Sequence, residues 1–317
     1  KQVLLLLDNF EQVMDAAVLV TELLEAAPRL KVLVTSQAAL NLYGEHCYPV
    51  PPLRLPDPHH LPSFESLLQF EAVRLFAERA VYARPDFRIT PANASAVVKI
   101  CQRLDGLPLA IELAAGRMVS LSPQAIAEHL TARLKLLTGG PRGRPARQQS
   151  LRGAMAWSYD LLGAVEQAVF RRLSVFVGGF TPEAAGAVCQ ARDDGSVGLL
   201  DVIGSLVAKS LVRQVATPDG AMRFALLPTV REYGAEVLAI LGEREATHQA
   251  HAAFYLALAE AGEREQFGPQ QAEWIQRLSM DRVNLVAAME WLRERGDPEP
   301  TLRLATALWM FAWISGY

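Results

Sequence analysis

The sequence has few of the features that mark secreted, membrane-spanning or nucleic-acid-coating proteins. Its 317 residues contain three cysteines, Cys47, Cys101 and Cys189, which lie far apart and match no zinc-binding spacing. They fit reduced thiols in a cytoplasmic protein. No apolar run approaches the roughly 20 residues of a membrane helix, and no signal-peptide pattern is present. The net charge of -3 provides no global basic field for nonspecific nucleic-acid binding.

Length and composition indicate an ordinary globular chain with more than one domain. With 51% hydrophobic and 21% charged residues it can build well-packed cores. Its 317 residues suffice for roughly two to three domains of about 100–150 residues each. The chain opens on Lys1, directly before an apolar strand, and stops at Tyr317, directly after an apolar helix. We therefore expect it to be a piece of a longer protein.

The first stretch of the chain combines a buried strand with an acidic end. Val3–Leu7 is an unbroken run of five aliphatic residues, which is typical of a parallel strand buried on both faces. Asp8 follows at once, at the carboxyl end of the strand, where open α/β sheets bind their ligands. In phosphate-handling sheets an aspartate there holds Mg²⁺ or its water shell, the Walker B arrangement. The simpler alternative is that Asp8 only caps the next helix.

A second strand should lie parallel to the first. Residues 12–27 carry apolar side chains at helical spacing, and Leu30–Val34 is another aliphatic run. A strand, a helix and a strand in this order form a βαβ unit with a right-handed crossover. The polar triplet Thr35–Gln37 would then emerge beside Asp8 at the same edge of the sheet.

Helices dominate the next part of the chain. Apolar spacing and proline at helix starts predict a small bundle of helices over 64–84, 91–103, 109–118 and 122–137. The tripeptide Gly106-Leu107-Pro108 separates two of them and, taken alone, indicates a corner between helices. A linker rich in glycine and proline, residues 139–145, follows the bundle.

Helices followed by a hairpin form the pattern of a winged helix. We predict helices over 150–162, 164–176, 181–190 and 196–209, then strands over 211–216 and 222–227 around a Pro-Asp-Gly turn. A winged helix can enter a DNA groove. However, the candidate recognition helix, residues 197–209, carries Lys209 as its one cation, whereas phosphate contacts need several. We therefore interpret this part as a regulatory domain rather than a DNA-binding one.

The chain ends in a helical region. Amphipathic patterns predict helices over 229–241, 247–262, 270–296 and 299–314. Pairs of such helices with small residues at their contacts favour packing similar to tetratricopeptide repeats, although no clean repeat period is present.

Several segments, in this order, resemble the STAND ATPases of the NB-ARC/AP-ATPase type, closest to the bacterial regulators of that class. They include LLLLDNFEQV at 4–13, LKVLVTSQAAL at 30–40, GEHCYPVPPL at 44–53 and RLDGLPLAIELAA at 103–115. The resemblance implies a mostly α protein with an N-terminal α/β piece. It implies four parts: residues 1–62 end the nucleotide-binding domain, 63–140 form a helical lid, 146–245 a winged helix, and 246–317 start a helical array.

The resemblance also implies a nucleotide site. Its residues in this sequence are Asp8 as the magnesium ligand, Asp8 and Asn9 as the catalytic pair, and Thr35, Ser36, Gln37, Gly106 and Pro108 as nucleotide contacts. The cofactors would be ATP or ADP with Mg²⁺. The phosphate-binding loop GxxxxGK[ST] is absent from this sequence, so we expect it in a segment that precedes Lys1. Without it we expect this chain alone to bind nucleotide weakly and to be inactive.

Three departures from the family pattern predict a slow switch rather than a fast enzyme. Gln37 stands where relatives carry an arginine, and an amide cannot neutralise charge in the transition state. Leu226-Leu227-Pro228 stands where relatives carry Met-His-Asp, so no side-chain donor is available there. Asn9 replaces a second acidic residue, and an amide is a poor general base.

The sequence therefore favours a nucleotide-dependent regulatory switch in a cytoplasmic signalling ATPase or transcriptional regulator. We expect a protein or small ligand to act through the C-terminal helices, and an output domain outside this chain to contact DNA. The alternative is a non-enzymatic module in which the winged helix and helical repeats bind protein or DNA without nucleotide. We expect no contact with a membrane.

Overall fold

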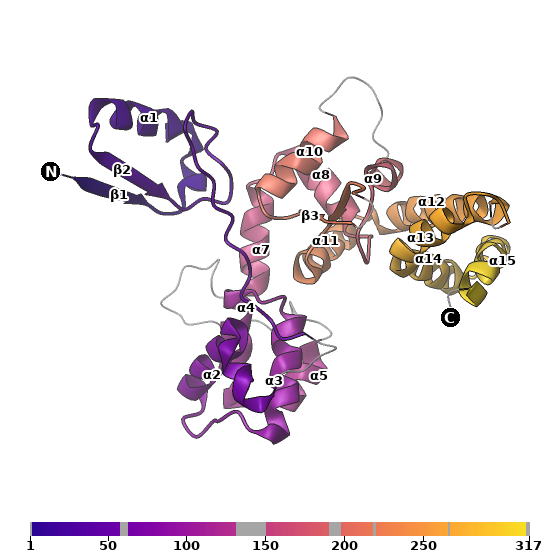
Figure 1. Cartoon of the computed structure of the whole chain (residues 1–317), viewed down its shortest axis with the longest axis horizontal. Helices are drawn as coiled ribbons and strands as arrows, with labels where there is room; N and C mark the ends of the chain where they lie inside the picture. Colours follow the sequence, from indigo (N-terminus) through magenta and orange to yellow (C-terminus); the bar gives the residue numbers. More distant parts are fainter. Residues whose placement is uncertain are drawn as a thin grey trace.

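The computed structural model describes residues 2–57, 63–130, 150–189, 198–217, 220–265 and 267–314. Most of these residues are helical, and two small two-stranded sheets complete the secondary structure of the described ranges. The expected mostly α chain with an N-terminal α/β piece is thereby confirmed in outline. Figure 1 shows the α/β piece, a helical bundle, a winged helix and a C-terminal group of helices, in that order along the chain.

The N-terminal α/β unit contains both predicted strands with their predicted ends. Strands β1 (Val3–Leu7) and β2 (Leu30–Val34) are parallel, and Leu7 pairs with Val34 at the carboxyl edge. The helix predicted over 12–27 begins later, as α1 (Ala17–Ala26), after two short 3-10 helices. Val13 lies between these 3-10 helices with a non-helical φ of -135°, which delays the start of α1.

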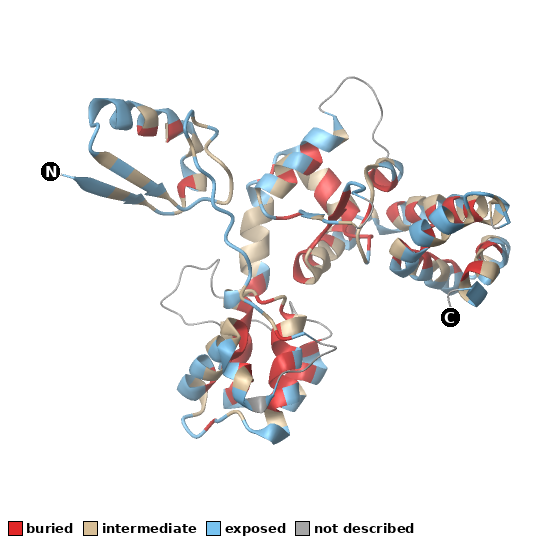
Figure 2. Ribbon diagram, viewed as in Figure 1, coloured by how far each residue is buried: buried red, intermediate tan, exposed pale blue. Residues whose placement is uncertain are grey.

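The expectation that β1 is buried on both faces is wrong for the described chain. Leu4 is 64% exposed, Leu6 is 61% exposed and Leu33 is 54% exposed. The physical reason is that α1 and the 3-10 helices cover one face of the sheet and leave the other open (Figure 2). Two strands and one helix cannot enclose a parallel sheet, which normally needs cover on both faces.

The helical bundle, here called the lid after the expected role, follows an extended linker. It contains η3 (Phe64–Gln69), α2 (Glu71–Ala83), α3 (Pro91–Arg103), α4 (Pro108–Gly116), η4 (Arg117–Val119) and α5 (Pro123–His129). The helix predicted over 64–84 is interrupted because Phe70 is extended, with a ψ of 120°. Ser122 caps α5 as predicted, accepting a hydrogen bond from the amide of Ala125 at 3.2 Å. The predicted extension of this helix to Leu137 lies outside the described residues.

The winged helix has the predicted order of elements. It contains α7 (Leu151–Asp160), α8 (Ala164–Leu173), α9 (Pro182–Cys189), α10 (Leu199–Ala208), β3 (Arg213–Val215), β4 (Arg223–Ala225) and α11 (Pro228–Ile240). Strands β3 and β4 pair antiparallel, with Gln214 opposite Phe224. A bridge between Phe180 and Phe224 attaches the segment before α9 to the hairpin.

The C-terminal region contains α12 (Arg244–Arg264), α13 (Gln271–Met280), α14 (Arg282–Arg295) and α15 (Pro298–Ile314). The single helix predicted over 270–296 is therefore two helices, which meet at Asp281. Helix α12 packs against both α14 and α15, and α14 packs against α15. None of the helices in the described ranges combines the length and apolarity needed to cross a membrane.

The described residues form two separate hydrophobic cores. One contiguous core runs through the lid, the winged helix and the C-terminal helices, from Leu67 to Phe311. The α/β unit has its own small core around Phe10, Ala17 and Val20. An extended segment connects the two bodies, and Figure 1 shows the α/β unit standing apart from the helices.

Candidate functional site

The polar ends of the two strands meet, as the sequence predicts. The Thr35 hydroxyl donates a hydrogen bond to Asp8 Oδ1, and the Asn9 amide side chain donates to Asp8 Oδ2 at 3.1 Å. The Asn9 backbone N–H donates in turn to Thr35 Oγ1 at 3.0 Å. Asp8, Asn9 and Thr35 thus form one cluster at the carboxyl edge of β1 and β2, in which Asp8 and Thr35 are exposed and Asn9 is half-buried.

The backbone around this cluster is held by the sheet. The Thr35 N–H donates to the Leu7 carbonyl at 2.9 Å, and the Phe10 N–H donates to the Thr35 carbonyl at 2.9 Å. Asn9 adopts a left-handed conformation with a φ of 56°, which asparagine tolerates better than most residues. This turn directs the chain away from β1 and leaves the Asp8 carboxylate beside Thr35.

The cluster offers oxygen atoms that suit a hard cation. A carboxylate and a hydroxyl at a strand end fit Mg²⁺, which commonly binds one or two carboxylates together with water and phosphate oxygens. Within the described residues, however, no group of three or more His, Cys, Asp or Glu side chains gathers to form a complete metal site. The donor set therefore fits a magnesium ion only together with phosphate or water ligands.

Ser36 and Gln37 take different positions beside the cluster. The Ser36 hydroxyl accepts a hydrogen bond from the Ala38 N–H at 3.2 Å, so it stabilises its own turn. The Gln37 N–H donates to Glu11 Oε2 at 3.3 Å, which fixes the backbone of this half-buried residue. Glu11 was not among the expected site residues, and its contact with the second strand end could not be inferred from sequence spacing.

Gly106 and Pro108 lie in the lid, in a different body from Asp8 (Figure 1). Gly106 has a φ of 68°, and a Cβ atom there would lie 2.4 Å from the Leu53 carbonyl oxygen. The Leu53 N–H also donates to the Gly106 carbonyl at 3.0 Å. Packing against the linker thus explains the glycine, and Pro108 starts α4, where its missing N–H is tolerated. The structure therefore does not bring these two residues to Asp8.

The lid turn instead meets the start of α11. The fully buried Thr229 donates a hydrogen bond through Oγ1 to Asp105 Oδ2 at 3.4 Å. Thr229 directly follows Leu226-Leu227-Pro228, and Asp105 directly precedes Gly106. The two tripeptides that family resemblance connects with the nucleotide are thus neighbours in space.

The surface that would face DNA carries little positive charge. From residue 198 to residue 210, which spans α10 and its flanks, the exposed residues are Gly198, Leu200, Asp201, Gly204, Ala208 and Ser210. Lys209, which follows α10, forms an ion pair with Glu166 at 2.5 Å. Among the described residues of α10 and the hairpin, Arg213 is the exposed cation, because Arg223 is only 4% exposed.

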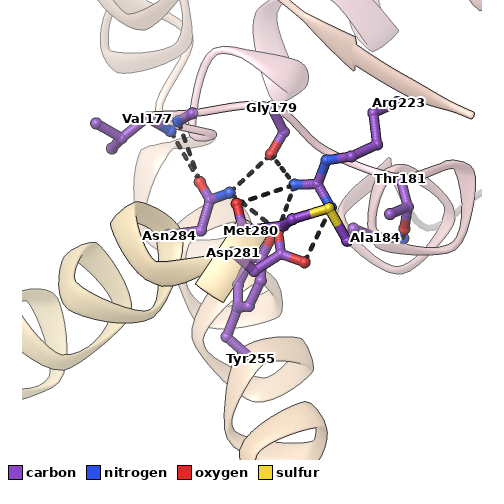
Figure 3. A network of polar contacts seen from close by, with 10 residues as sticks. Val177, Gly179, Thr181, Ala184, Arg223, Tyr255, Met280, Asp281 and Asn284 are labelled. Atoms are coloured by element: carbon purple, nitrogen blue, oxygen red, sulfur yellow. Dashed lines mark hydrogen bonds and ion pairs between the residues drawn. The ribbon is translucent and has the colours of Figure 1, made fainter. Parts of the chain in front are cut away.

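Arg223 takes part in a buried network that sequence reasoning missed (Figure 3). Although it lies in the hairpin, Arg223 is only 4% exposed. Its guanidinium donates to both oxygens of Asp281, at 2.7 and 3.1 Å, and to the Gly179 carbonyl at 2.9 Å. The Tyr255 hydroxyl donates to the same carboxylate at 3.1 Å. Burial, followed by the nearby Asp281 carboxylate, raises the pKa of Tyr255 and keeps its proton available as a donor.

Asn284 extends the network to the loop before α9. Its side-chain oxygen accepts from the Val177 N–H at 3.0 Å, and its amide nitrogen donates to the Gly179 carbonyl at 2.8 Å. Asp281 and Asn284 lie three residues apart at the start of α14, so one helical turn presents both side chains to the winged helix. The four residues Arg223, Tyr255, Asp281 and Asn284 are called the interdomain network below.

Comparison with known proteins identifies the middle part of the chain. Residues 162–239 match the winged helix-turn-helix domain family. The chain thus contains a winged helix-turn-helix domain. The match covers α8 to α11 and includes the hairpin.

The chain is also similar to long mycobacterial proteins. Over 310 residues, or 97% of this chain, it is 42% identical to proteins of Mycobacterium tuberculosis and Mycobacterium bovis, each named "Putative HTH-type transcriptional regulator". Over 248 residues, or 77% of this chain, it is 40% identical to a Mycobacterium tuberculosis protein named "Uncharacterized protein", of which 59% is covered. The chain spans about a third of the length of the two regulators, since 33% of each is covered.

Proposed function

We propose that this chain is the switch part of a transcriptional regulator, and that its winged helix regulates the protein through contacts with protein rather than with DNA. The relatives named as regulators support the assignment to a transcriptional regulator. The second half of the proposal rests on one observation, the shortage of free positive charge on the surface of α10 and the hairpin.

A winged helix-turn-helix domain is a fold that can read a DNA groove, so DNA contact is what the family match suggests first. Affinity for DNA comes largely from cations that neutralise phosphates and release counterions. Here Lys209 is paired with Glu166 and Arg223 is buried against Asp281, which leaves Arg213 on the described face. The exposed Asp201 would in addition repel phosphate.

We further propose that the switch depends on ATP or ADP with Mg²⁺. Asp8, Asn9 and Thr35 form a cluster at the edge where parallel sheets bind phosphates, which supports a magnesium-binding role. One face of β1 and β2 is exposed and apolar, which supports the proposal that a further segment packs on it and supplies the phosphate-binding loop. Lid and α/β unit have separate cores joined by a linker, so they can close on a nucleotide between Asp8 and Pro108. The protein would then be a slow ATPase, and this chain alone would be inactive.

The remaining partners follow from this proposal. A protein or small ligand would act on the C-terminal helices, and DNA would be contacted by an output domain that is not part of the 317 residues. The second candidate function is direct DNA binding by the winged helix, which the family match favours.

Fluorescence anisotropy with the whole chain and a labelled DNA duplex tests the proposal. We expect no binding tighter than about 10⁻⁵ M at physiological salt, the nonspecific range. The whole chain is required because a cut after residue 245 would remove Asp281 and leave Arg223 without its carboxylate. Saturable, sequence-selective binding that is lost in Arg213→Ala and kept in Arg303→Ala would establish the second candidate instead.

A further inference from the structure

A short segment links the C-terminal helices to the lid. We propose that Arg223–Thr229, here called the connector, transmits displacements of α12 and α14 to the lid turn at Asp105 and Gly106. This goes beyond the proposed function by naming the route through which an input at the C-terminal helices reaches that turn. Its consequence for nucleotide binding rests on the proposed function, but the coupling itself does not.

The first end of the connector is fixed to the C-terminal helices. Arg223 and Asp281 have side chains that are only 5% and 4% exposed, and their guanidinium and carboxylate form two hydrogen bonds. Separating them would leave a buried charge without a partner, which is strongly unfavourable. Tyr255 from α12 binds the same carboxylate, so α12, α14 and β4 are held at one point (Figure 3).

The middle of the connector is held by burial and by backbone hydrogen bonds. Phe224, Ala225 and Leu226 are all buried. Phe224 also exchanges two backbone hydrogen bonds with Phe180, at 2.8 and 2.9 Å. Because Asn284 holds the neighbouring loop at Val177 and Gly179, the same network fixes both sides of this bridge.

The second end of the connector is fixed to the lid. Pro228 starts α11, and the buried Thr229 contacts Asp105. Asp105 and Gly106 have φ values of 56° and 68°, so the turn combines two left-handed residues. The Gly106 carbonyl accepts a hydrogen bond from the Leu53 N–H at 3.0 Å, so the linker contacts the same turn.

The connector therefore runs without a break over the six peptide units from Arg223 to Thr229, and both of its ends are held by side-chain contacts. Spatial continuity alone does not establish energetic coupling. Coupling needs an element with two conformations whose equilibrium is shifted by contacts at both ends. The lid turn qualifies because Asp105, a non-glycine residue, is held in the sparsely populated left-handed region by the contacts around it. Loss of the interdomain network should therefore loosen the turn.

Hydrogen exchange of the full chain without nucleotide tests the coupling. Asp281→Asn keeps the side-chain volume but removes the charge that pairs with Arg223. We expect faster exchange in peptide 174–181, next to the network, and about fivefold or more faster exchange in peptide 104–110 of the lid, since coupling between sites is typically at least 1 kcal/mol. Glu260→Gln, which breaks an exposed ion pair with Arg303 in the same helical region, is the matched control and should change neither peptide.

A second variant separates transmission from general loosening. Thr229→Val removes the hydroxyl that contacts Asp105 and keeps the side-chain shape. Adding Asp281→Asn to Thr229→Val should still accelerate exchange in 174–181 but should no longer accelerate 104–110. Replacing the pair by apolar groups and removing the Tyr255 hydroxyl that would lose its acceptor, as Arg223→Met with Asp281→Leu and Tyr255→Phe, should restore slow exchange at 174–181, because a buried pair can be exchanged for apolar groups.

If Asp281→Asn accelerates 174–181 and leaves 104–110 unchanged, the network is a local joint and the connector transmits nothing. If Asp281→Asn fails to fold, Asn284→Ala tests the same prediction with the ion pair intact, and an unchanged 104–110 then refutes it. Since no nucleotide is present, failure of the switch proposal would show separately, as absent Mg²⁺-ATP binding in the longer protein.

Discussion

Protonation of His251 should destabilise the junction between the winged helix and α12. The ring is 2% exposed and lies among aromatic side chains, 5.3 Å from the Phe176 ring centroid and 4.7 Å from that of Tyr255. Its Nε2 atom is buried without a hydrogen-bond partner. Burial, with a smaller contribution from His248, lowers the pKa of His251 from 6.5 to about 3.

The direction of the pH effect follows from this lowered pKa. Below pH 6.5 the unfolded chain takes up a proton at this site, whereas the folded chain does so only near pH 3. The stability contribution is therefore complete above pH 6.5 and is lost as the pH falls towards 3. At pH 5 the loss amounts to about 2 kcal/mol, a value that hardly depends on the folded pKa as long as it stays below 4.

Urea unfolding at pH 7.5 and pH 5.0 measures this loss. His251→Phe keeps an aromatic ring in the site and removes the titration, so its free energy of unfolding should fall by about 2 kcal/mol less than that of the wild type between the two pH values. His248, stacked on Trp291, is present in both proteins and cancels in the comparison. The exposed His129 supplies the control, because His129→Gln should behave as the wild type does. Equal losses in the wild type and His251→Phe would refute the reasoning.

Three further predictions concern the candidate site. In a longer polypeptide that includes a phosphate-binding loop, Asp8→Ala should abolish Mg²⁺-dependent ATP turnover while circular dichroism stays unchanged; unchanged turnover would reduce Asp8 to a structural cap. In the same polypeptide, Gln37→Arg should favour ATP over ADP by about 1–3 kcal/mol, the range for hydrogen bonds to charged groups, and equal shifts for both nucleotides in calorimetry would show that residue 37 does not contact the γ-phosphate. Gly106→Ala should cost about 2–4 kcal/mol in urea unfolding because the new Cβ meets Leu53, whereas Gly44→Ala, also left-handed but open, should cost only about 1 kcal/mol.

The sequence predicts local elements well where one kind of pattern dominates. The aliphatic runs Val3–Leu7 and Leu30–Val34 are strands with the expected ends, and the residues around the Pro-Asp-Gly turn form the expected hairpin. The meeting of Asp8 with Thr35 follows from parallel pairing alone. For Gly106 and Pro108, the resemblance implies contact with a nucleotide. Local packing already explains both residues, and the contact with nucleotide stays a prediction.

The interdomain network could not be predicted because its partners are distant in sequence. Arg223 and Asp281 are 58 residues apart, and the order of residues does not show that their elements pack together. Arginine is mostly exposed in folded proteins, so the residue type gives no sign that Arg223 is buried. The break between α13 and α14 was missed for a similar reason: the apolar spacing continues across it, while Asp281 leaves the helix to bind Arg223 and Tyr255.

The open sheet of the α/β unit has a consequence for how the chain behaves in concentrated solution. Val3–Leu7 is entirely apolar, with no charge and no proline, which are features of segments prone to aggregate. In the described chain its only strand partner is β2, so a row of backbone groups remains open on its other side. A segment that pairs with this edge would therefore also prevent aggregation, because β1 of one molecule could no longer pair with a strand of another molecule.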